Sequence, residues 1–434
     1  MSSHPPNSLL SLAAKLRSSD LPLHAYLDQL QELFERREPE VLAFVPEDDR
    51  FGRLHREADA LLTAYPQVEN RPFLFGVPVG VKDIFHVSGL LTKAGSKLPV
   101  DQLQDVEALS VTTLRSAGAL ILGKTVTTEF AYFAPGPTHN PHVLDHTPGG
   151  SSSGSAAAVA AGLCPLTLGT QTIGSINRPA AFCGVVGYKP SYDRISRQGV
   201  IPLSPSADHV GLFVPAAADV APVAALLCKD WRAATGTVTN RPILGIPEGP
   251  YLENVSAVGL EHFQAACGEL LDAGFEVKRV ATMLDFDEIV ARHNFIVAAD
   301  AANVHKDWYR EYRELYHEKT ADLIERGMKV SQAQLERAQQ GQLKLRQELS
   351  AQMRENHLDL WISPAAIGPA PAGLNSTGDP IMNLPWTHAG LPTLSLPAGQ
   401  TANGLPLGLQ LAADWYADEQ LNSWSESIAK VVSS

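Results

Sequence analysis

The sequence has few cysteines, no long apolar run and no cluster of basic residues. Its four cysteines (Cys164, Cys183, Cys228 and Cys267) include no C-x-x-C pair, so we expect free, buried thiols in a reducing compartment. No stretch approaches the roughly 18 apolar residues that span a bilayer. The start of the chain, Met1 to Leu12, lacks the basic region of a secretory signal. These absences predict a cytoplasmic protein without a membrane segment.

The charge balance is acidic. Lys and Arg number 34 against 47 Asp and Glu, giving a net charge of −13, so we expect no nucleic-acid partner. Hydrophobic residues make up 44% of the 434 residues, which is typical of a globular protein with a large core. The 33 glycines and 31 prolines predict many tight turns between short elements.

Hydrophobic periodicity predicts an α/β architecture. Residues 1–65 show helical spacing, and later segments alternate between strand and helix patterns, which favours one domain over 1–434 with a mixed, mostly parallel sheet flanked by helices. Residues 284–357 instead predict two long charged helices, a helical excursion that we expect to form one wall of a cleft. The expected strands are Val77–Val81, Ala119–Leu122, Leu166–Gly169, Val185–Tyr188, Pro242–Ile246, Phe275–Val280, Leu358–Ile362, Thr393–Leu396 and Leu405–Leu411.

Two short motifs match phosphate-binding and metal-binding patterns without the required context. Gly118 to Thr125 fits the Walker A expression, but its central residues are themselves an apolar strand, so we interpret Lys124 as a solvated lysine at the strand end. His139, His142 and His146 have spacings that suit a zinc site on a helix, yet the prolines around them argue for a loop. We therefore expect no metal and no cofactor.

Glycine and serine are concentrated between Gly149 and Ser175. Glycine is unfavourable in helices, and such a segment is usually explained by backbone amides that approach a ligand closely. Gly150 to Gly154 also satisfies the G-x-S-x-G elbow of α/β-hydrolases, with Ser152 as nucleophile, but a polar loop stands where that motif needs a strand.

Lys82, at the end of a predicted apolar strand, is a candidate base. A serine hydroxyl needs a base to become nucleophilic, and burial can keep a lysine neutral by lowering its pKa. The alternative is a surface pair between Lys82 and the adjacent Asp83. Together with Ser151 and Ser175, Lys82 suggests a hydrolase that activates serine without histidine.

The stretch from Gly149 to Pro190 resembles the signature of the amidase signature family. The similarity extends to Gly76–Asp83, Leu120–Thr125, Asn383–Pro385, Gly390–Pro392 and Gly404–Gln410, and so covers most of the chain apart from the excursion. The resemblance implies the amidase-signature fold, with Ser175 as nucleophile, Ser151 as a bridging serine that follows a cis peptide bond, and Lys82 as base. It also implies an oxyanion hole built from the backbone N–H groups of Thr172, Ile173, Gly174 and Ser175.

Three positions depart from the family's usual Gly-Thr-Asp-Thr-Gly-Gly-Ser-Ile-Arg. Gln171 replaces an aspartate, Ile173 a glycine and Asn177 an arginine. The acid and the base are lost together, which suggests that a neutral amide pair replaces a charged pair in support of the loop. Ile173 adds a branched side chain beside the oxyanion donors, so we expect it to reshape the acyl pocket.

The expected activity is hydrolysis of a linear C–N bond next to a carbonyl. No fixed charge is evident for an anionic acyl group, which favours a neutral or aryl amide contacted by Phe130, Tyr132, Gly150 and Trp386, with Phe133, Trp308 and Tyr312 as further aromatics near the cleft. Carbamate cleavage, as in the urethane-cleaving members of the family, and ester cleavage are close alternatives. A role as part of an amidotransferase is less favoured, and a non-catalytic binding protein is the alternative from another class. The long helices leave a homodimer open.

Overall fold

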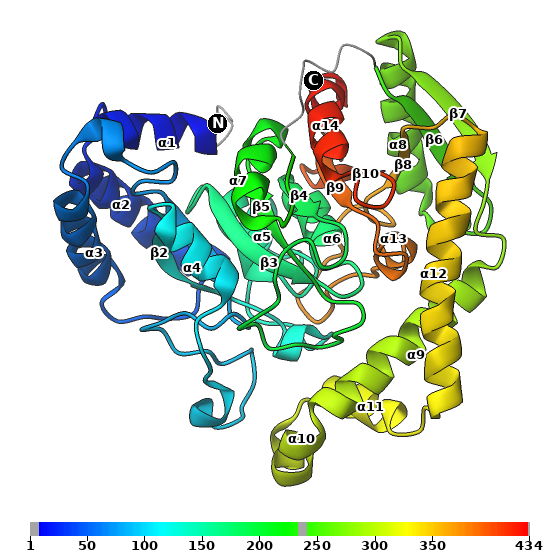
Figure 1. Cartoon of the computed structure of the whole chain (residues 1–434), viewed down its shortest axis with the longest axis horizontal. Coiled ribbons are helices and arrows are strands. Elements are labelled where there is room, and N and C mark those ends of the chain that lie inside the picture. The colour runs from blue at the N-terminus through cyan, green and yellow to red at the C-terminus, as the bar shows by residue number, and fades with distance from the viewer. Residues whose placement is uncertain (1–7, 233–240, 433–434) are drawn as a thin grey trace.

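Ten strands form one twisted sheet in the computed structural model, which describes residues 8–232 and 241–432. Their order is β2-β1-β3-β5-β4-β9-β10-β8-β6-β7 (Figure 1). The strands are β1 (Pro78–Lys82), β2 (Leu120–Thr125), β3 (Leu166–Gln171), β4 (Val186–Lys189), β5 (His209–Val214), β6 (Ile243–Glu248), β7 (Glu276–Ala281), β8 (Leu360–Pro364), β9 (Thr393–Gln400) and β10 (Pro406–Ala412).

The predicted mixed sheet is confirmed, and its parallel pairs lie at the two ends. β1 is parallel to β2 and β3, and β6 is parallel to β7 and β8, while the pairs between these groups are antiparallel. Because β1 and β3 run in the same direction, their carboxyl ends meet at one edge of the sheet. Lys82 ends β1 at the edge where Gln171 ends β3.

Strand β5 is the one strand that the sequence analysis missed. All six residues of His209–Val214 are buried, and the strand pairs antiparallel with both β3 and β4. A short strand buried on both faces shows no alternation of polar and apolar residues, so its periodicity is uninformative. All nine predicted strands are present, with ends shifted by a few residues.

Helices cover both faces of the sheet. Between the first and last strands the structure has α4 (Leu109–Ser116), α5 (Ser153–Ala160), α6 (Asn177–Cys183), α7 (Val220–Leu227), α8 (Ala257–Asp272) and α13 (Leu384–His388); α1 (Leu9–Ser18), α2 (Leu23–Val41) and α3 (Arg50–Ala64) precede the sheet, and α14 (Asp418–Val432) follows it. The alanine-rich α5 packs closely on β1, β2 and β3. A Cβ on Gly154 would lie 2.2 Å from the carbonyl oxygen of Ala43, so only glycine permits this approach.

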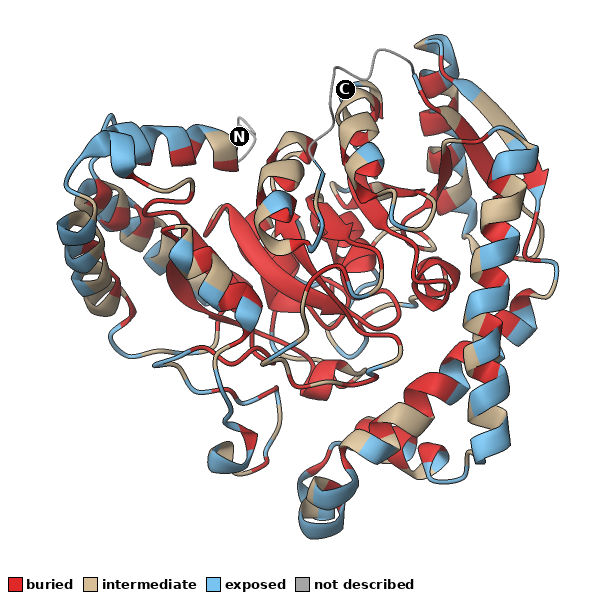
Figure 2. Ribbon diagram, viewed as in Figure 1, coloured by how far each residue is buried: buried red, intermediate tan, exposed pale blue. Residues whose placement is uncertain are grey.

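Residues 284–357 form four helices rather than two. They are α9 (Phe286–Val304), α10 (Lys306–Tyr312), α11 (Glu318–Gly327) and α12 (Gln332–Glu355), and they stand along the side of the molecule opposite α1 to α3 (Figure 1). α9 packs against both α11 and α12. Figure 2 shows that α12 turns an exposed face outward, whereas the central strands are buried.

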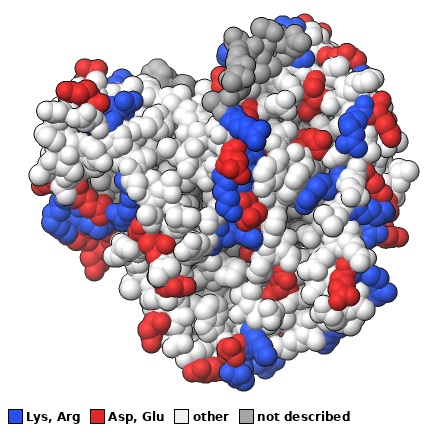
Figure 3. Space-filling model, in the orientation of Figure 1, with Lys and Arg blue, Asp and Glu red and all other residues white. Residues whose placement is uncertain are grey.

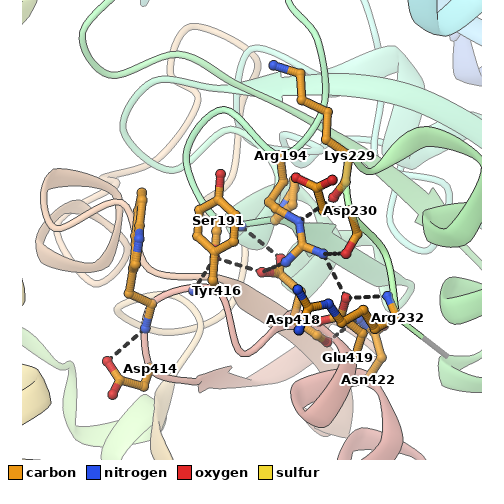
Figure 4. A network of polar contacts seen from close by, with 12 residues as sticks. Ser191, Arg194, Lys229, Asp230, Arg232, Asp414, Tyr416, Asp418, Glu419 and Asn422 are labelled. Atoms are coloured by element: carbon orange, nitrogen blue, oxygen red, sulfur yellow. Dashed lines mark hydrogen bonds and ion pairs between the residues drawn. The ribbon is translucent and has the colours of Figure 1, made fainter. Parts of the chain in front are cut away.

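A buried polar network ties the segment after β4 to the start of α14 (Figure 4). The Asp418 carboxylate accepts hydrogen bonds from Tyr188 Oη (2.7 Å), Ser191 Oγ (2.7 Å) and Arg194 Nη1 (3.1 Å). Arg194 also pairs with Glu419 at 2.7 Å. The network thus holds α14 against β4 and the segment that follows it.

Two expectations about individual residues are now resolved. The four cysteines are free and buried, as predicted. Lys124 is not solvated, contrary to our interpretation: it is buried in β2, and its Nζ lies 2.7 Å from Asp83 Oδ1.

On the face drawn in Figure 3, acidic and basic side chains are interspersed, without a basic patch. No helix within the described ranges combines the length and apolarity needed to cross a membrane.

Candidate active site

Lys82 is fully buried at the end of β1, where it meets two hydroxyl groups. Its Nζ donates to Ser151 Oγ at 2.7 Å and to Thr170 Oγ1 at 2.8 Å. Burial lowers the pKa of Lys82 well below 10.5, and the nearby Asp208 carboxylate opposes this only in part. The alternative of a surface pair with Asp83 is therefore wrong, because Asp83 pairs with Lys124 instead.

Ser151 connects Lys82 with Ser175. While the Ser151 hydroxyl contacts Lys82, its backbone N–H donates to Ser175 Oγ at 3.0 Å. Gly150 makes this approach possible with a backbone φ of +65°, since a Cβ there would lie 3.2 Å from the Ser175 Cα. The expected cis peptide bond is absent from the described residues. The hydrogen bond that joins Ser151 to Ser175 in this structure comes from the Ser151 amide.

The loop from Thr172 to Ser175 presents unpaired backbone donors. Four residues, Thr172, Ile173, Gly174 and Ser175, lie between β3 and α6. Their backbone N–H groups have no acceptor among the described residues. The carbonyl groups point to protein donors instead: Thr172 O contacts His293 Nε2 at 3.1 Å, and Ile173 O accepts from Thr387 Oγ1 at 2.7 Å. Such a loop can receive a developing negative charge.

Asp208 fixes the start of this loop. Its carboxylate accepts from Thr172 Oγ1 at 2.6 Å and from the backbone N–H groups of Leu203 and Ser204 at 2.9 and 3.0 Å. Burial raises its pKa to about 6 in spite of these bonds. Asp208 thus supplies negative charge near Lys82 while it orients Thr172.

Gln171 holds the end of the same loop, but not through the neutral side-chain pair that we expected. Its Oε1 accepts from the backbone N–H groups of Ile176 (2.7 Å) and Asn177 (3.0 Å), and its Nε2 donates to Thr387 Oγ1 at 2.9 Å. The Asn177 side chain turns away and accepts from Thr393 Oγ1 at 2.9 Å. The single side-chain amide of Gln171 thus satisfies the two backbone N–H groups at this turn. That role requires an acceptor oxygen but no charge.

The serines open into a pocket with about 280 Å³ of empty space. Ile173 lies in its wall, and α11 supports the wall through a contact of Arg326 Nη2 with Tyr132 Oη at 3.1 Å. The lining residues are Ala131, Tyr132, Phe133, Ser151, Thr172, Ile173, Gly174, Ser175, Arg178, Leu203, Thr377 and Pro380.

Most of the predicted aromatic contacts lie elsewhere. Phe130 is buried against His305, with ring centroids 4.6 Å apart, and stacks on Trp308. Trp386 is fully buried and donates to Tyr251 Oη at 3.0 Å. Both are core residues, because a large aromatic side chain gains more from full burial than from a wet cleft. Of the proposed substrate contacts, Tyr132 lines the pocket.

The nucleophile of the G-x-S-x-G motif and the three histidines of the zinc pattern do not line the pocket. Ser152 Oγ exchanges hydrogen bonds with the backbone of Thr170 at 3.1 and 3.2 Å, so it is buried against β3 and does not line the pocket. His139, His142 and His146 lie in a loop with separate partners: Leu144 O, Cys183 O and Asp145 Oδ1. Among the described residues, no group of His, Cys, Asp and Glu could hold a metal ion.

Sequence reasoning missed three polar residues of the site, namely Thr170, Arg178 and Asp208. Thr170 lies one residue before Gln171 and Arg178 one residue after Asn177, so both adjoin positions that the motif singled out. An arginine beside Pro179 in a segment of small residues was a visible anomaly. Asp208 precedes the missed strand β5 and had no comparable signal.

Comparisons with known proteins show which proteins this chain is similar to. The chain is 30% identical to a glutamyl-tRNA(Gln) amidotransferase subunit from Synechococcus sp. (strain CC9902), over 92% of this chain and 90% of the relative. A structure described as "Crystal structure of amidase" superposes with a TM-score of 0.88 and 28% identity, over 98% of this chain and all of that one.

A second solved chain is similar over the same extent. It comes from the work "An unexpected vestigial protein complex reveals the evolutionary origins of an s-triazine catabolic enzyme", with a TM-score of 0.87 and 26% identity over 98% of both chains. The model of the Amidase family matches residues 50–421, which include every residue of the site described above. The chain belongs to the amidase signature family.

Proposed function

We propose that the protein hydrolyses small linear amides through an acyl-enzyme on Ser175. The observation that carries the proposal is the contact of Lys82 Nζ with Ser151 Oγ at 2.7 Å, made by a fully buried lysine whose pKa is strongly lowered. A neutral amine can accept a proton, which an ammonium group cannot. The N–H of Ser151, which contacts Ser175 Oγ at 3.0 Å, keeps the two serines adjacent.

In the proposed reaction Lys82 takes the proton of the Ser151 hydroxyl, and Ser151 takes that of Ser175. Ser175 Oγ then bonds to the amide carbon, and the N–H groups of Thr172 to Ser175 stabilise the oxyanion, each being worth about 3 kcal/mol in related sites. The C–N bond breaks as Ser151 returns a proton to the leaving amine. Water then cleaves the ester, which releases the acid and restores Ser175.

Aryl amides, carbamates and esters share this acyl chemistry, and we include them as candidate substrates. The rings of Tyr132 and Phe133 in the pocket wall support an aromatic or planar group. A second candidate is a role within an amidotransferase, supported by the identity of 30% to relatives with that name. That function needs a partner protein, so release of ammonia from an amide by the isolated protein distinguishes the two.

A fluorophosphonate probe tests the nucleophile. The wild type is treated with the probe, and intact mass and peptide mapping locate the label. We expect the label on Ser175, its loss in Ser175→Ala, and much slower labelling in Ser151→Ala. Ser152→Ala is the matched control and should be labelled normally, because the Ser152 hydroxyl bonds to the backbone of Thr170 in β3. Label on Ser152, or no label at all, would refute the proposal.

The same variants are then assayed with p-nitroanilide, aryl carbamate and p-nitrophenyl ester substrates. We expect all three to require Ser175 and Lys82. A carbamate rate above the amide rate would assign carbamate hydrolysis as the main activity.

A further inference from the structure

Arg178 is a buried cation in the wall of the candidate active site. It belongs to α6, three residues after Ser175, and its side chain is about 1% exposed. Its backbone N–H donates to Gly174 O at 3.1 Å, which ties the arginine to the loop of oxyanion donors. Arg178 lines the same pocket as Ser151 and Ser175.

The guanidinium group of Arg178 is largely unpartnered. Within the described chain, only Nη2 has an acceptor, Thr377 Oγ1, at the long distance of 3.3 Å. Nε and Nη1 are buried and have no partner among the described residues. Buried donors without acceptors are rare and costly, and more so on a charged group. A guanidinium with free donors at a pocket wall fits a planar, two-oxygen acceptor.

No carboxylate of residues 8–232 or 241–432 pairs with this charge. Asp379 is the acidic residue that acts on it electrostatically, but its side chain is exposed, forms no ion pair with Arg178, and accepts from the backbone N–H of Ile381 at 2.9 Å. Burial lowers the pKa of Arg178 to about 10, so the group still carries its charge at neutral pH. A lone buried charge is destabilising unless a ligand supplies the opposite one.

We propose that the substrate amide carries a carboxylate, which the guanidinium group of Arg178 binds within the pocket. This inference rests on the proposed function and narrows its substrate class to short monoamides of dicarboxylic acids. It replaces the preference for a neutral acyl group, which rested on the absence of an evident fixed charge. Arg178 follows Ser175 by three residues and lines the same pocket, so the carboxylate lies a few bonds from the scissile carbonyl.

The test compares amides that differ only in the remote group. Ammonia release is measured for the monoamides of oxalic, malonic, succinic and glutaric acids and for the matching diamides, in which a neutral amide replaces the carboxylate. We expect kcat/KM for the best monoamide to exceed that for its diamide by about 100-fold or more, because a buried charge pair discriminates strongly against a neutral analogue.

Variants assign this preference to Arg178. In Arg178→Met the ratio of the two kcat/KM values should fall by about 100-fold, and Arg178→Lys should restore part of it, since lysine keeps the charge but not the planar fork. Asp379→Asn is the control, which removes the nearest acidic charge and should preserve or increase the ratio. In the Ser175→Ala background, calorimetry should detect binding of the monoamide, and Arg178→Met should abolish it.

Equal kcat/KM values for monoamides and diamides, or an Arg178→Met variant with the wild-type ratio, would overturn the inference. Labelling of Ser175 separates this failure from a failure of the proposed function. A protein labelled on Ser175 that ignores the carboxylate retains the proposed function and loses the inference.

Discussion

Replacement of Lys82 by methionine should abolish most amide hydrolysis without unfolding the protein. Methionine has a similar length and no titratable group, so the variant removes the base and both of its hydrogen bonds, to Ser151 Oγ (2.7 Å) and Thr170 Oγ1 (2.8 Å). General-base catalysis contributes about 10²- to 10⁴-fold, which corresponds to about 3 to 5.5 kcal/mol in the activation barrier. We expect a loss in kcat/KM within that range.

The free energy of unfolding should change much less. Two hydrogen bonds of about 1 kcal/mol each are lost, but so is the cost of burying the amine. These effects oppose each other, and we expect a net change within about 2 kcal/mol at pH 7, measured by urea unfolding. An activity loss with a retained fold distinguishes a catalytic residue from a structural one.

Lys189 provides a matched control. It also ends a strand, β4, and is fully buried, and burial lowers its pKa to about 7. Its Nζ contacts the carbonyl oxygens of Pro190 (3.1 Å) and Leu391 (2.5 Å) rather than a serine. Lys189→Met should therefore change the free energy of unfolding by no more than a similar amount, while the folded fraction keeps its kcat.

The pH dependence gives an independent readout. Because the pKa of Lys82 is lowered, the folded chain binds fewer protons than the unfolded chain between the two pKa values. The free energy of unfolding therefore rises with pH through that window, and Lys82→Met should lack this contribution. For catalysis, kcat/KM should fall as the pH drops below the folded pKa, since only neutral Lys82 is a base. More than a tenth of the wild-type kcat/KM in Lys82→Met would refute the assignment of the base.

Two further predictions concern the support of the oxyanion loop. The pKa of Asp208 is raised from 3.8 to about 6, so the folded chain binds more protons in this range. The free energy of unfolding should consequently fall by about 3 kcal/mol in total as the pH rises from about 4 to 6; Asp208→Asn should remove this slope, and urea unfolding at several pH values checks it. Gln171→Glu keeps an acceptor oxygen for the two backbone N–H groups, but it loses the Nε2 donor to Thr387 and buries an unpaired charge, which should cost about 3 kcal/mol. Adding Asn177→Arg to this variant should recover at least half of the lost stability, as measured by thermal or urea unfolding. If nothing is recovered, an ion pair between residues 171 and 177 cannot replace the support that the Gln171 amide gives the loop.

The amino-acid sequence determined much of the fold and the outline of the site. Nine of the ten strands are visible in its periodicity, because each is bounded by turn residues and has its own apolar pattern. The glycines and serines at Gly149 to Ser151 and at Thr172 to Ser175 predicted loops that present backbone donors, separated by the alanine-rich helix α5 and by β3. The positive φ of +65° at Gly150 is likewise a local requirement, which glycine meets without strain.

Tertiary structure alone decided what the individual polar side chains do. Three lysines at strand ends, Lys82, Lys124 and Lys189, look alike in the sequence. In the fold, Lys82 contacts two hydroxyl groups, Lys124 pairs with an aspartate, and Lys189 contacts two backbone carbonyl groups. The same holds for Arg178, whose donors stay unpaired because no acidic side chain of the described chain folds against it. The partners of Lys82 are 69 and 88 residues away in the chain. Burial and pairing over such separations set the pKa and the chemistry, and no local pattern encodes them.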